Sequence, residues 1–376
     1  MSYVRILLKK GYRRRSLYLV LILLVGLITL LNWNNERNAT GANSLLNQTE
    51  LRIKDYNGYI KQNKQIASAD SPAVTNLVQQ RQYLQAMVKA LKKGDEQTYL
   101  TNQIALLTWQ KKHTPADQLV KIVSIPGMTN TIAKMLLLAQ KQAQGQTGVE
   151  LEGYEVRGST FLYRTIQLYS PVILTAVIIF VLTPLVISPY FKRLDIEREL
   201  PRPAAQKVLL RTGVSVTMGV ACLLIFYFAC FLVGTIRHGA GSFAYPIFVY
   251  SRDRYWLEPL WQVLAKILVL QIALIVAISA SMQLIAQLTR NSFATLFLSL
   301  ILIIGSYLLI DQTSASALTP LVPTYYLGPT GVVTGTFRAL TKNSQISLPG
   351  GILVNTGYSC LVLLAVWYGE RRGERA

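Results

Sequence analysis

The sequence has few charged residues and few cysteines. Asp, Glu, Lys and Arg make up 15% of its 376 residues, well below the roughly 25% typical of soluble domains. Hydrophobic residues make up 51%, and the mean hydropathy is +0.33. These values exclude a disordered chain and disfavour a single soluble domain. The three cysteines, Cys222, Cys230 and Cys360, all fall in apolar runs, which excludes a disulfide scaffold and favours small buried side chains.

Recognisable catalytic motifs are missing as well. The sequence has no G-x-x-x-x-G-K-[ST] nucleotide loop, no G-x-S-x-G, no H-E-x-x-H and no C-x-x-C. Its two histidines, His113 and His238, are far apart in the chain. We therefore expect a protein that is not an enzyme, has no ATP site of its own and binds no cofactor or metal itself.

Six apolar runs are long enough to cross a bilayer, which takes about 20 helical residues. They cover residues 16–33, 168–190, 214–236, 260–288, 292–310 and 351–368. The first run and its basic flank also fit a cleaved signal peptide, but no clear small-x-small site follows it. We interpret it as a retained signal-anchor.

The positive charge indicates the orientation of these runs. Lys and Arg outnumber Asp and Glu by 38 to 18, a net charge of +20. The segments before the first run, between runs two and three, between runs four and five, and after the sixth carry 16 basic and 5 acidic residues. By the positive-inside rule these segments and both termini are cytoplasmic. The charge therefore reports topology and contact with anionic lipid, and we expect no nucleic-acid partner.

The predicted architecture is an all-α integral membrane protein with a mostly helical extracytoplasmic domain. Residues 1–15 form a basic amphipathic segment, 16–33 the first span, 34–165 the outer domain and 166–376 a five-helix transmembrane domain. A 3.6-residue apolar period over 74–91 predicts a helix, with Gly94 at its C-terminus and Asp95 capping the next helix. We expect two to four helices, some in antiparallel hairpins, another at 129–144, and a short strand at 149–156.

Polar residues within the apolar runs are costly in hydrocarbon and are candidates for function. Lys266 lies near an outer end, where its amine reaches the membrane surface. Four amides lie deeper, and they either form interhelical hydrogen bonds or line a translocation path. They are Gln271, Gln283, Gln287 and Asn355. The aromatic residues of 237–259 predict an aromatic belt at the level of the lipid headgroups. Pro246 and Pro259 in the same segment predict a short interfacial helix or re-entrant turn.

The second inner loop, residues 192–211, reads KRLDIERELPRPAAQKVLLR. Its first part predicts a short charged helix that Pro201 ends, and an amphipathic stretch at 204–210 follows. An ordinary positive-inside loop does not need an Asp-x-Glu-x-Glu cluster. A helix that projects Glu197 and Glu199 would instead suit a cleft on a cytoplasmic partner.

This loop resembles the coupling helix of the permease subunits of type-2 ABC exporters. The similarity rests on Asp195-Ile196-Glu197-Arg198-Glu199-Leu200-Pro201, with Lys207 or Arg211 as the following base. The segments PTYYL at 323–327 and VVTG at 332–335 are similar to the residues that precede the last span in those permeases. The six spans and the large domain after the first span also match that family.

The resemblance implies a transport mechanism driven from the cytoplasm. A separate ABC ATPase subunit would bind ATP and Mg²⁺, and a second permease copy or a related permease would complete the transporter. The ATPase would push the coupling helix at 194–210 through Asp195, Glu197, Arg198, Glu199 and Leu200. The setting would be a bacterial cell membrane, and the exported substrate a peptide, an antibiotic or a lipid-like molecule.

A second hypothesis is an ATPase-linked mechanotransmission or sensing protein. Its outer domain would relay ATPase motion to an extracellular partner without transport. Such proteins usually have four spans, so six spans disfavour this alternative. Deletion of most of the outer domain separates the two hypotheses, because only the relay depends entirely on that domain.

Overall fold

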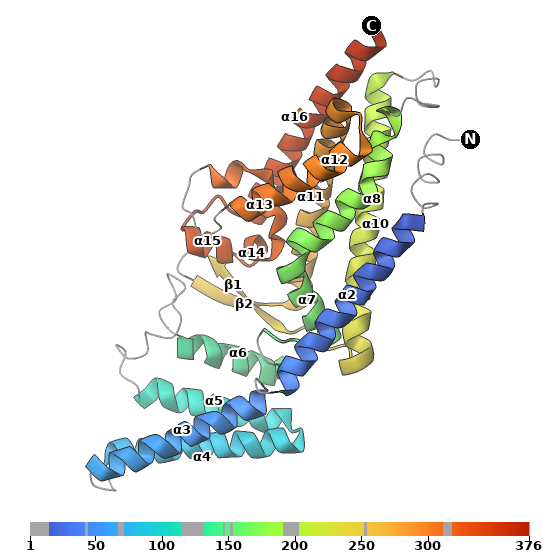
Figure 1. Ribbon diagram of the computed structural model, residues 1–376. Coiled ribbons are helices and arrows are strands. Elements are labelled where there is room, and N and C mark those ends of the chain that lie inside the picture. The colour runs from blue at the N-terminus through green and yellow to red at the C-terminus, as the bar shows by residue number, and fades with distance from the viewer. Residues whose placement is uncertain are drawn as a thin grey trace.

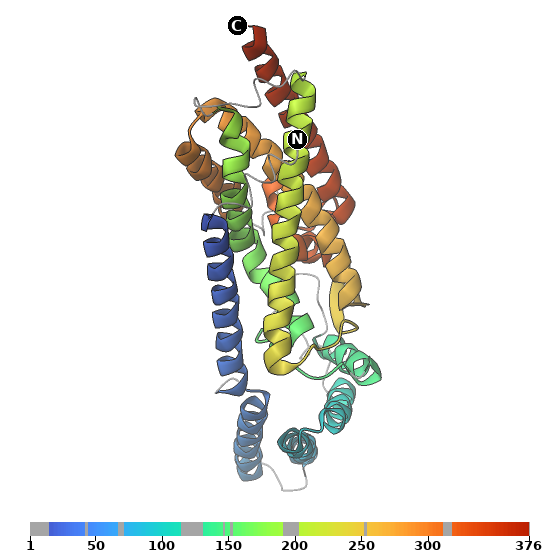
Figure 2. The ribbon, with the colours of Figure 1, turned by 90° about the vertical axis from the view of Figure 1, so that its right-hand side faces the viewer.

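The computed structural model describes residues 15–41, 44–66, 71–113, 131–145, 147–150, 153–190, 203–251, 254–310 and 318–375. The described residues form two parts, a bundle of long helices and a smaller helical domain at one of its ends (Figure 1). A quarter-turn shows the shorter helices of this domain nearly end-on below the bundle (Figure 2). We call the residues of α3 to α6 the helical domain.

The bundle confirms the prediction of six apolar helices. The described residues hold six helices long and apolar enough to cross a membrane. Four of them are single α-helices: α2 (Arg15–Thr40), α10 (Ala204–His238), α11 (Leu260–Thr289) and α16 (Leu348–Arg375). The second long helix consists of α7 (Gly158–Tyr169), the π-helix η2 (Ser170–Leu174), α8 (Thr175–Ile187) and the 3₁₀ turn η3 (Ser188–Tyr190). The fifth consists of α12 (Ser292–Ser299), the π-helix η4 (Leu300–Gly305) and α13 (Ser306–Leu309).

Two of these helices extend well beyond the predicted apolar runs. The second begins at Gly158 rather than at residue 168, and α10 begins at Ala204 rather than at residue 214. Hydropathy locates only the apolar stretch, whereas helical hydrogen bonding continues into polar turns. At α10 the limit is Pro203, an extended N-cap residue. The predicted amphipathic stretch 204–210 is therefore the first part of α10 and not a separate helix.

Helix α11 lies at the centre of the bundle and packs against α8, α10, α12 and α16. More than half of its residues are buried. By contrast, α2 and the α12–α13 helix bury only 17% of the apolar stretch that marks them as membrane spans. These two helices lie at the edge of the bundle, where an apolar exposed surface suits contact with lipid.

The helical domain contains α3 (Leu45–Ile66), α4 (Pro72–Lys93), α5 (Glu96–His113) and α6 (Thr131–Gly145). Consecutive helices pack against each other around a core that includes Leu84, Met87, Leu100 and Leu107. The predicted helix signals are confirmed, because Gly94 ends α4 with φ +70°. The Asp95 carboxylate accepts a hydrogen bond from the Thr98 amide at 2.9 Å. The predicted strand at 149–156 is wrong for its described residues, which form no strand.

The all-α prediction is wrong at one place. Strands β1 (Pro246–Ser251) and β2 (Arg254–Pro259) form an antiparallel hairpin where we expected an interfacial helix or re-entrant turn. Aromatic and β-branched residues pair across it, as in Val249 opposite Trp256 and Tyr250 opposite Tyr255. Such pairs favour strands, so the aromatic residues that suggested a membrane-interface belt also carried a strand signal.

Among the described residues, four short helices lie in the chain between the fifth and sixth long helices, and the last of them packs against strand β1 of the hairpin. They are the 3₁₀ helices η5 (Thr319–Leu321) and η6 (Pro323–Leu327), and α14 (Pro329–Val333) and α15 (Thr336–Thr341). Tyr325 and Tyr326 are fully buried beneath them. The Tyr250 amide donates to the Thr334 carbonyl at 2.7 Å. Gly335 follows with φ +72°, and a Cβ there would lie 2.0 Å from the Tyr250 carbonyl oxygen, so this close approach requires glycine.

Candidate functional site

The predicted coupling residues lie outside the described residues. Asp195, Glu197, Arg198, Glu199 and Leu200 all fall within 191–202. Their role in coupling stays a prediction. The structure does describe the residues on either side of this segment, and Tyr190, directly before it, meets Arg211 of α10 in one polar cluster.

This Arg211 cluster consists of Tyr190, Arg211 and Glu370, from η3, α10 and α16. The Arg211 Nη1 atom lies 2.8 Å from Glu370 Oε1, and the Arg211 side chain is only 2% exposed. The Tyr190 hydroxyl donates to the same carboxylate oxygen at 3.0 Å. The guanidinium also lies 5.8 Å from the centre of the Tyr190 ring. Both flanks of segment 191–202 are thus fixed to the last helix of the chain.

The Arg211 cluster has a clear energetic basis. A buried charge is costly unless a partner of opposite charge and hydrogen bonds compensate it. Glu370 is 13% exposed and provides both to Arg211. A basic residue at the end of the inner loop and an acid after the last apolar run are visible in the sequence, but 159 residues separate them. No local spacing indicates that they pair.

Inside the bundle, the predicted polar residues take part mainly in interhelical contacts. Gln271 donates to the Ser170 hydroxyl at 2.7 Å and accepts a hydrogen bond from the Tyr227 hydroxyl. Gln283 donates to the Thr212 hydroxyl at 2.8 Å. These bonds join α11 to η2 and α10. The interhelical hydrogen bonds that were one of the two predictions for these amides are therefore observed. A translocation path along these residues stays a prediction.

The other two amides lie along the contact between α11 and α16. Gln287 donates to the Val366 carbonyl at 3.3 Å. Asn355 is fully buried and donates to the Gly351 carbonyl of its own helix at 2.8 Å. Lys266, the one charge expected in this long helix, reaches Glu258 of the hairpin at 2.6 Å. The four predicted amides therefore do not converge on one site.

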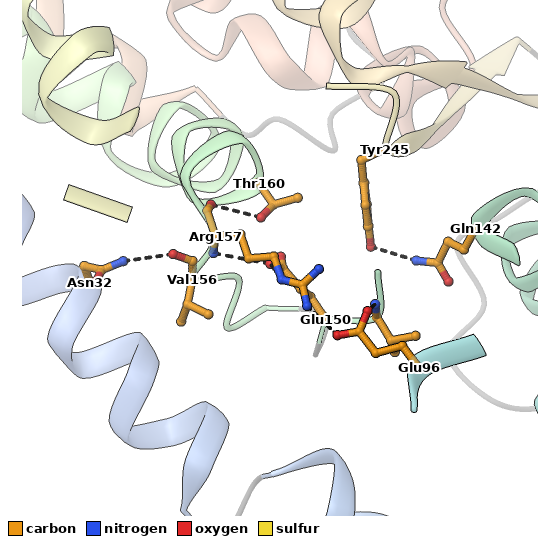
Figure 3. Close-up of polar contacts among 9 residues, drawn as sticks. Asn32, Glu96, Gln142, Glu150, Val156, Arg157, Thr160 and Tyr245 are labelled. Carbon is orange, nitrogen blue, oxygen red and sulfur yellow. Dashed lines mark hydrogen bonds and ion pairs between the residues drawn. The ribbon is translucent and has the colours of Figure 1, made fainter. Parts of the chain in front are cut away.

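A second polar centre, which the sequence interpretation missed, joins the helical domain to the bundle (Figure 3). We call Glu96, Glu150 and Arg157 the junction. The Arg157 guanidinium pairs with Glu96 of α5 and, at 3.4 Å, with Glu150. The Arg157 amide also donates to Glu150 at 3.3 Å. Since Arg157 directly precedes α7, this residue ties the start of the second long helix to the helical domain.

Further hydrogen bonds surround the junction. The Asn32 side chain on α2 donates to the Val156 carbonyl at 3.3 Å, and Gln142 on α6 donates to the Tyr245 hydroxyl at 3.2 Å. Figure 3 shows these two bonds on either side of Arg157. The Lys134 amine on α6 lies 4.5 Å from the Phe248 ring centre. Polar contacts therefore attach the helical domain to the start of α7 and to the hairpin, and they attach α2 to the residues just before α7.

Glu150 makes the junction sensitive to pH. Burial raises the pKa of its carboxyl above the ordinary value, although hydrogen bonding from Thr160 and the positive charge of Arg157 oppose this shift. A raised pKa in the folded state means that folding favours the protonated form. This stabilisation is complete below about pH 4.5, the ordinary glutamate range, and is lost as the pH rises through the folded-state pKa.

Replacement of Glu150 by Gln therefore has a pH-dependent effect on stability. The difference in Tm between Glu150→Gln and the parent protein should become less favourable to the variant as the pH falls from 8 to 4.5. Thermal unfolding in detergent at several pH values measures this difference. The exposed Glu50→Gln serves as the control and should show a much smaller trend. A Tm difference for Glu150→Gln that stays constant over this range contradicts the assignment.

Metal and cofactor sites have no support among the described residues, in which no group of three or more His, Cys, Asp or Glu side chains is placed to hold a metal ion. The expectation that this chain binds no cofactor stays a prediction. No protein-family model, no curated protein and no solved structure matches the chain significantly.

Proposed function

We propose that this protein is the permease subunit of an ATP-driven ABC exporter. The observation that carries the proposal is the Arg211 cluster. It joins the helices on either side of segment 191–202, which contains the predicted coupling residues, to Glu370 of α16. A partner that pushes on this segment would move the ends of α8, α10 and α16 together. Such a shared displacement suits alternating access driven from outside the bundle.

The surrounding architecture supports the same proposal. Six long apolar helices, a helical domain after the first helix, and short helices over the PTYYL and VVTG segments before the last agree with the resemblance to type-2 ABC exporter permeases. The proposed location is a bacterial cell membrane, with both termini in the cytoplasm and the helical domain outside. The proposed substrate is a peptide, an antibiotic or a lipid-like molecule.

The proposed partners follow from the missing nucleotide loop. A separate cytoplasmic ABC ATPase would bind ATP and Mg²⁺, and a second permease copy or a related permease would complete the transporter. We expect the full-length chain, purified from its native membrane in mild detergent, to carry a P-loop ATPase identifiable by mass spectrometry. The control is a parallel purification of the variant with residues 194–200 replaced by Gly and Ser, which should lose that subunit. A native complex without any P-loop ATPase would overturn the proposal.

The junction favours one alternative, an ATPase-linked mechanotransmission or sensing protein. Ion pairs from Arg157 to Glu96 and Glu150 join the helical domain directly to the second long helix. Motion of the bundle would therefore reach that domain. Deletion of residues 43–144 with a short linker separates the two functions. Loss of a response in an extracellular partner, from a protein that shows no transport of its own, would favour the relay, whereas loss of transport would favour the exporter.

A further inference from the structure

Polar residues recur at the interface between α10 and α11. Thr212 bonds to Gln283 at 2.8 Å, Gly219 packs against Ile275, and Tyr227 bonds to Gln271. From the first pair to the third, the residue numbers rise along α10 and fall along α11, as expected for antiparallel helices. We call each pair a level of the α10–α11 interface. The first and the third level are about 22 Å apart, because fifteen helical steps separate residues 212 and 227.

Ser215 and Ser279 lie between the first two levels. Ile275 and Gln283, four residues before and four after Ser279, both contact α10. Residues four apart share a helix face, so Ser279 faces α10 as well. Ser215 lies between Thr212 and Gly219, which both contact α11, and so shares their face. The two serines therefore belong to the same level of the interface.

The hydroxyls of these two serines have no hydrogen-bond partner within the described part of the chain, and neither does the Gln283 Oε1 atom. All three residues are 0% exposed. Serine and threonine in helices usually donate to the carbonyl four residues earlier, and Thr212 does so at 2.8 Å. Ser215 and Ser279 do not. Three unsatisfied polar atoms at one buried level are costly, and ordered water commonly satisfies such groups.

A small cavity lies one level further along the same interface. Its volume is about 20 Å³, and its lining combines Ser170, Thr175 and Gln271 with aliphatic side chains that include Ile275 and Leu223. A cavity needs roughly 10–15 Å³ to hold one water, with two or more polar partners. Ser170 begins the π-helix η2, and its carbonyl accepts a hydrogen bond from the Thr175 amide. The size of the cavity and its three polar lining residues suit a single water.

We propose that the α10–α11 interface binds ordered water at two levels. One water or a pair bridges Ser215, Ser279 and Gln283, and one occupies the cavity beside Ser170 and Gln271. Water at these levels satisfies the buried hydroxyls and provides exchangeable partners when α10 shifts along α11. The proposed waters do not depend on the proposed ATPase. They apply to the chain both as an exporter and as a mechanotransmission or sensing protein.

The direct test is a cryo-EM map of the full chain in lipid nanodiscs, at a resolution that shows individual waters. We expect density within hydrogen-bond distance of the Ser215 and Ser279 hydroxyls and in the cavity beside Gln271. Empty density at both levels would overturn the proposal. A Tm that rises with Na⁺ but not with choline would also overturn it, because it would assign the site to a cation instead of water.

A measurement of stability tests the proposed water independently. Ser279→Ala should lower the Tm by about 2 °C, because the variant removes one anchor of the bridging water. Ser215→Ala should act similarly, and the double variant should lose less than the sum, since both anchor the same water. The control is Thr217→Val at an exposed position of α10, with no expected change. A Tm raised by Ser279→Ala would show an unhydrated hydroxyl and contradict the proposal.

Discussion

Glu370→Ala is expected to destabilise the protein by about 3–5 kcal/mol, the usual cost of removing one partner of a buried ion pair. The reason is the environment of Arg211, which is 2% exposed and lies 2.8 Å from Glu370. Without the carboxylate, the guanidinium stays buried with its main charge partner gone. Thermal or denaturant unfolding of the full chain in detergent measures the loss.

The control uses the same helix. Arg372 is exposed and two residues from Glu370, so Arg372→Ala should change the stability by well under 1 kcal/mol. The double variant Arg211→Met with Glu370→Leu tests the cause. Since apolar residues of similar volume often replace a buried ion pair without loss, this double variant should recover most of the stability lost by Glu370→Ala. If Glu370→Ala behaves like Arg372→Ala, the assignment of a stabilising buried pair is wrong.

Glu197→Ala combined with Glu199→Ala is expected to abolish transport while the chain still reaches the membrane. Under the proposed function, these carboxylates orient the coupling helix in the ATPase cleft through charge-assisted hydrogen bonds. Each such bond contributes about 1.5–3 kcal/mol when desolvated, so loss of both should reduce coupled transport at least tenfold. ATP hydrolysis by the complex should continue without transport.

Export from intact cells and ATPase activity of the purified complex, measured on the same variant, check this result. A matched control is Glu50→Ala with Asp55→Ala, which removes two exposed acids from the helical domain and should leave transport unchanged. Normal transport by Glu197→Ala with Glu199→Ala would contradict the coupling assignment. Loss of transport together with loss of the protein from the membrane would instead indicate a folding role for the two carboxylates and would equally contradict coupling.

The Glu370 variant and the Glu197 and Glu199 double variant have different readouts. Glu370→Ala acts on stability, because Glu370 compensates a buried charge. The Glu197 and Glu199 double variant acts on the contact with a partner, and its stability should be close to that of the parent protein. A protein in which both changes alter only stability would have no coupling role for the inner loop.

Structural features that depend on neighbouring residues in the chain were predicted well from the sequence. Apolar runs of about 20 residues indicated the long helices, and the period of 74–91 indicated α4 with its Gly94 terminus. These signals depend on neighbouring residues only. The hairpin was missed because aromatic residues suit both a membrane interface and a strand, and local composition does not distinguish the two. Val249 pairs with Trp256 across the hairpin, and local composition does not show such pairing between strands.

The sequence by itself determined which segments are apolar, where several helices end and where positive charge is concentrated. Those properties follow from local hydration and from backbone sterics. Only the tertiary structure decided which polar groups meet. Arg211 pairs with Glu370, Arg157 with Glu96, and Ser215 shares a level with Ser279, although long stretches of chain separate each pair. Burial makes an unpaired charge or hydroxyl costly, so the packing of distant helices selects the partners.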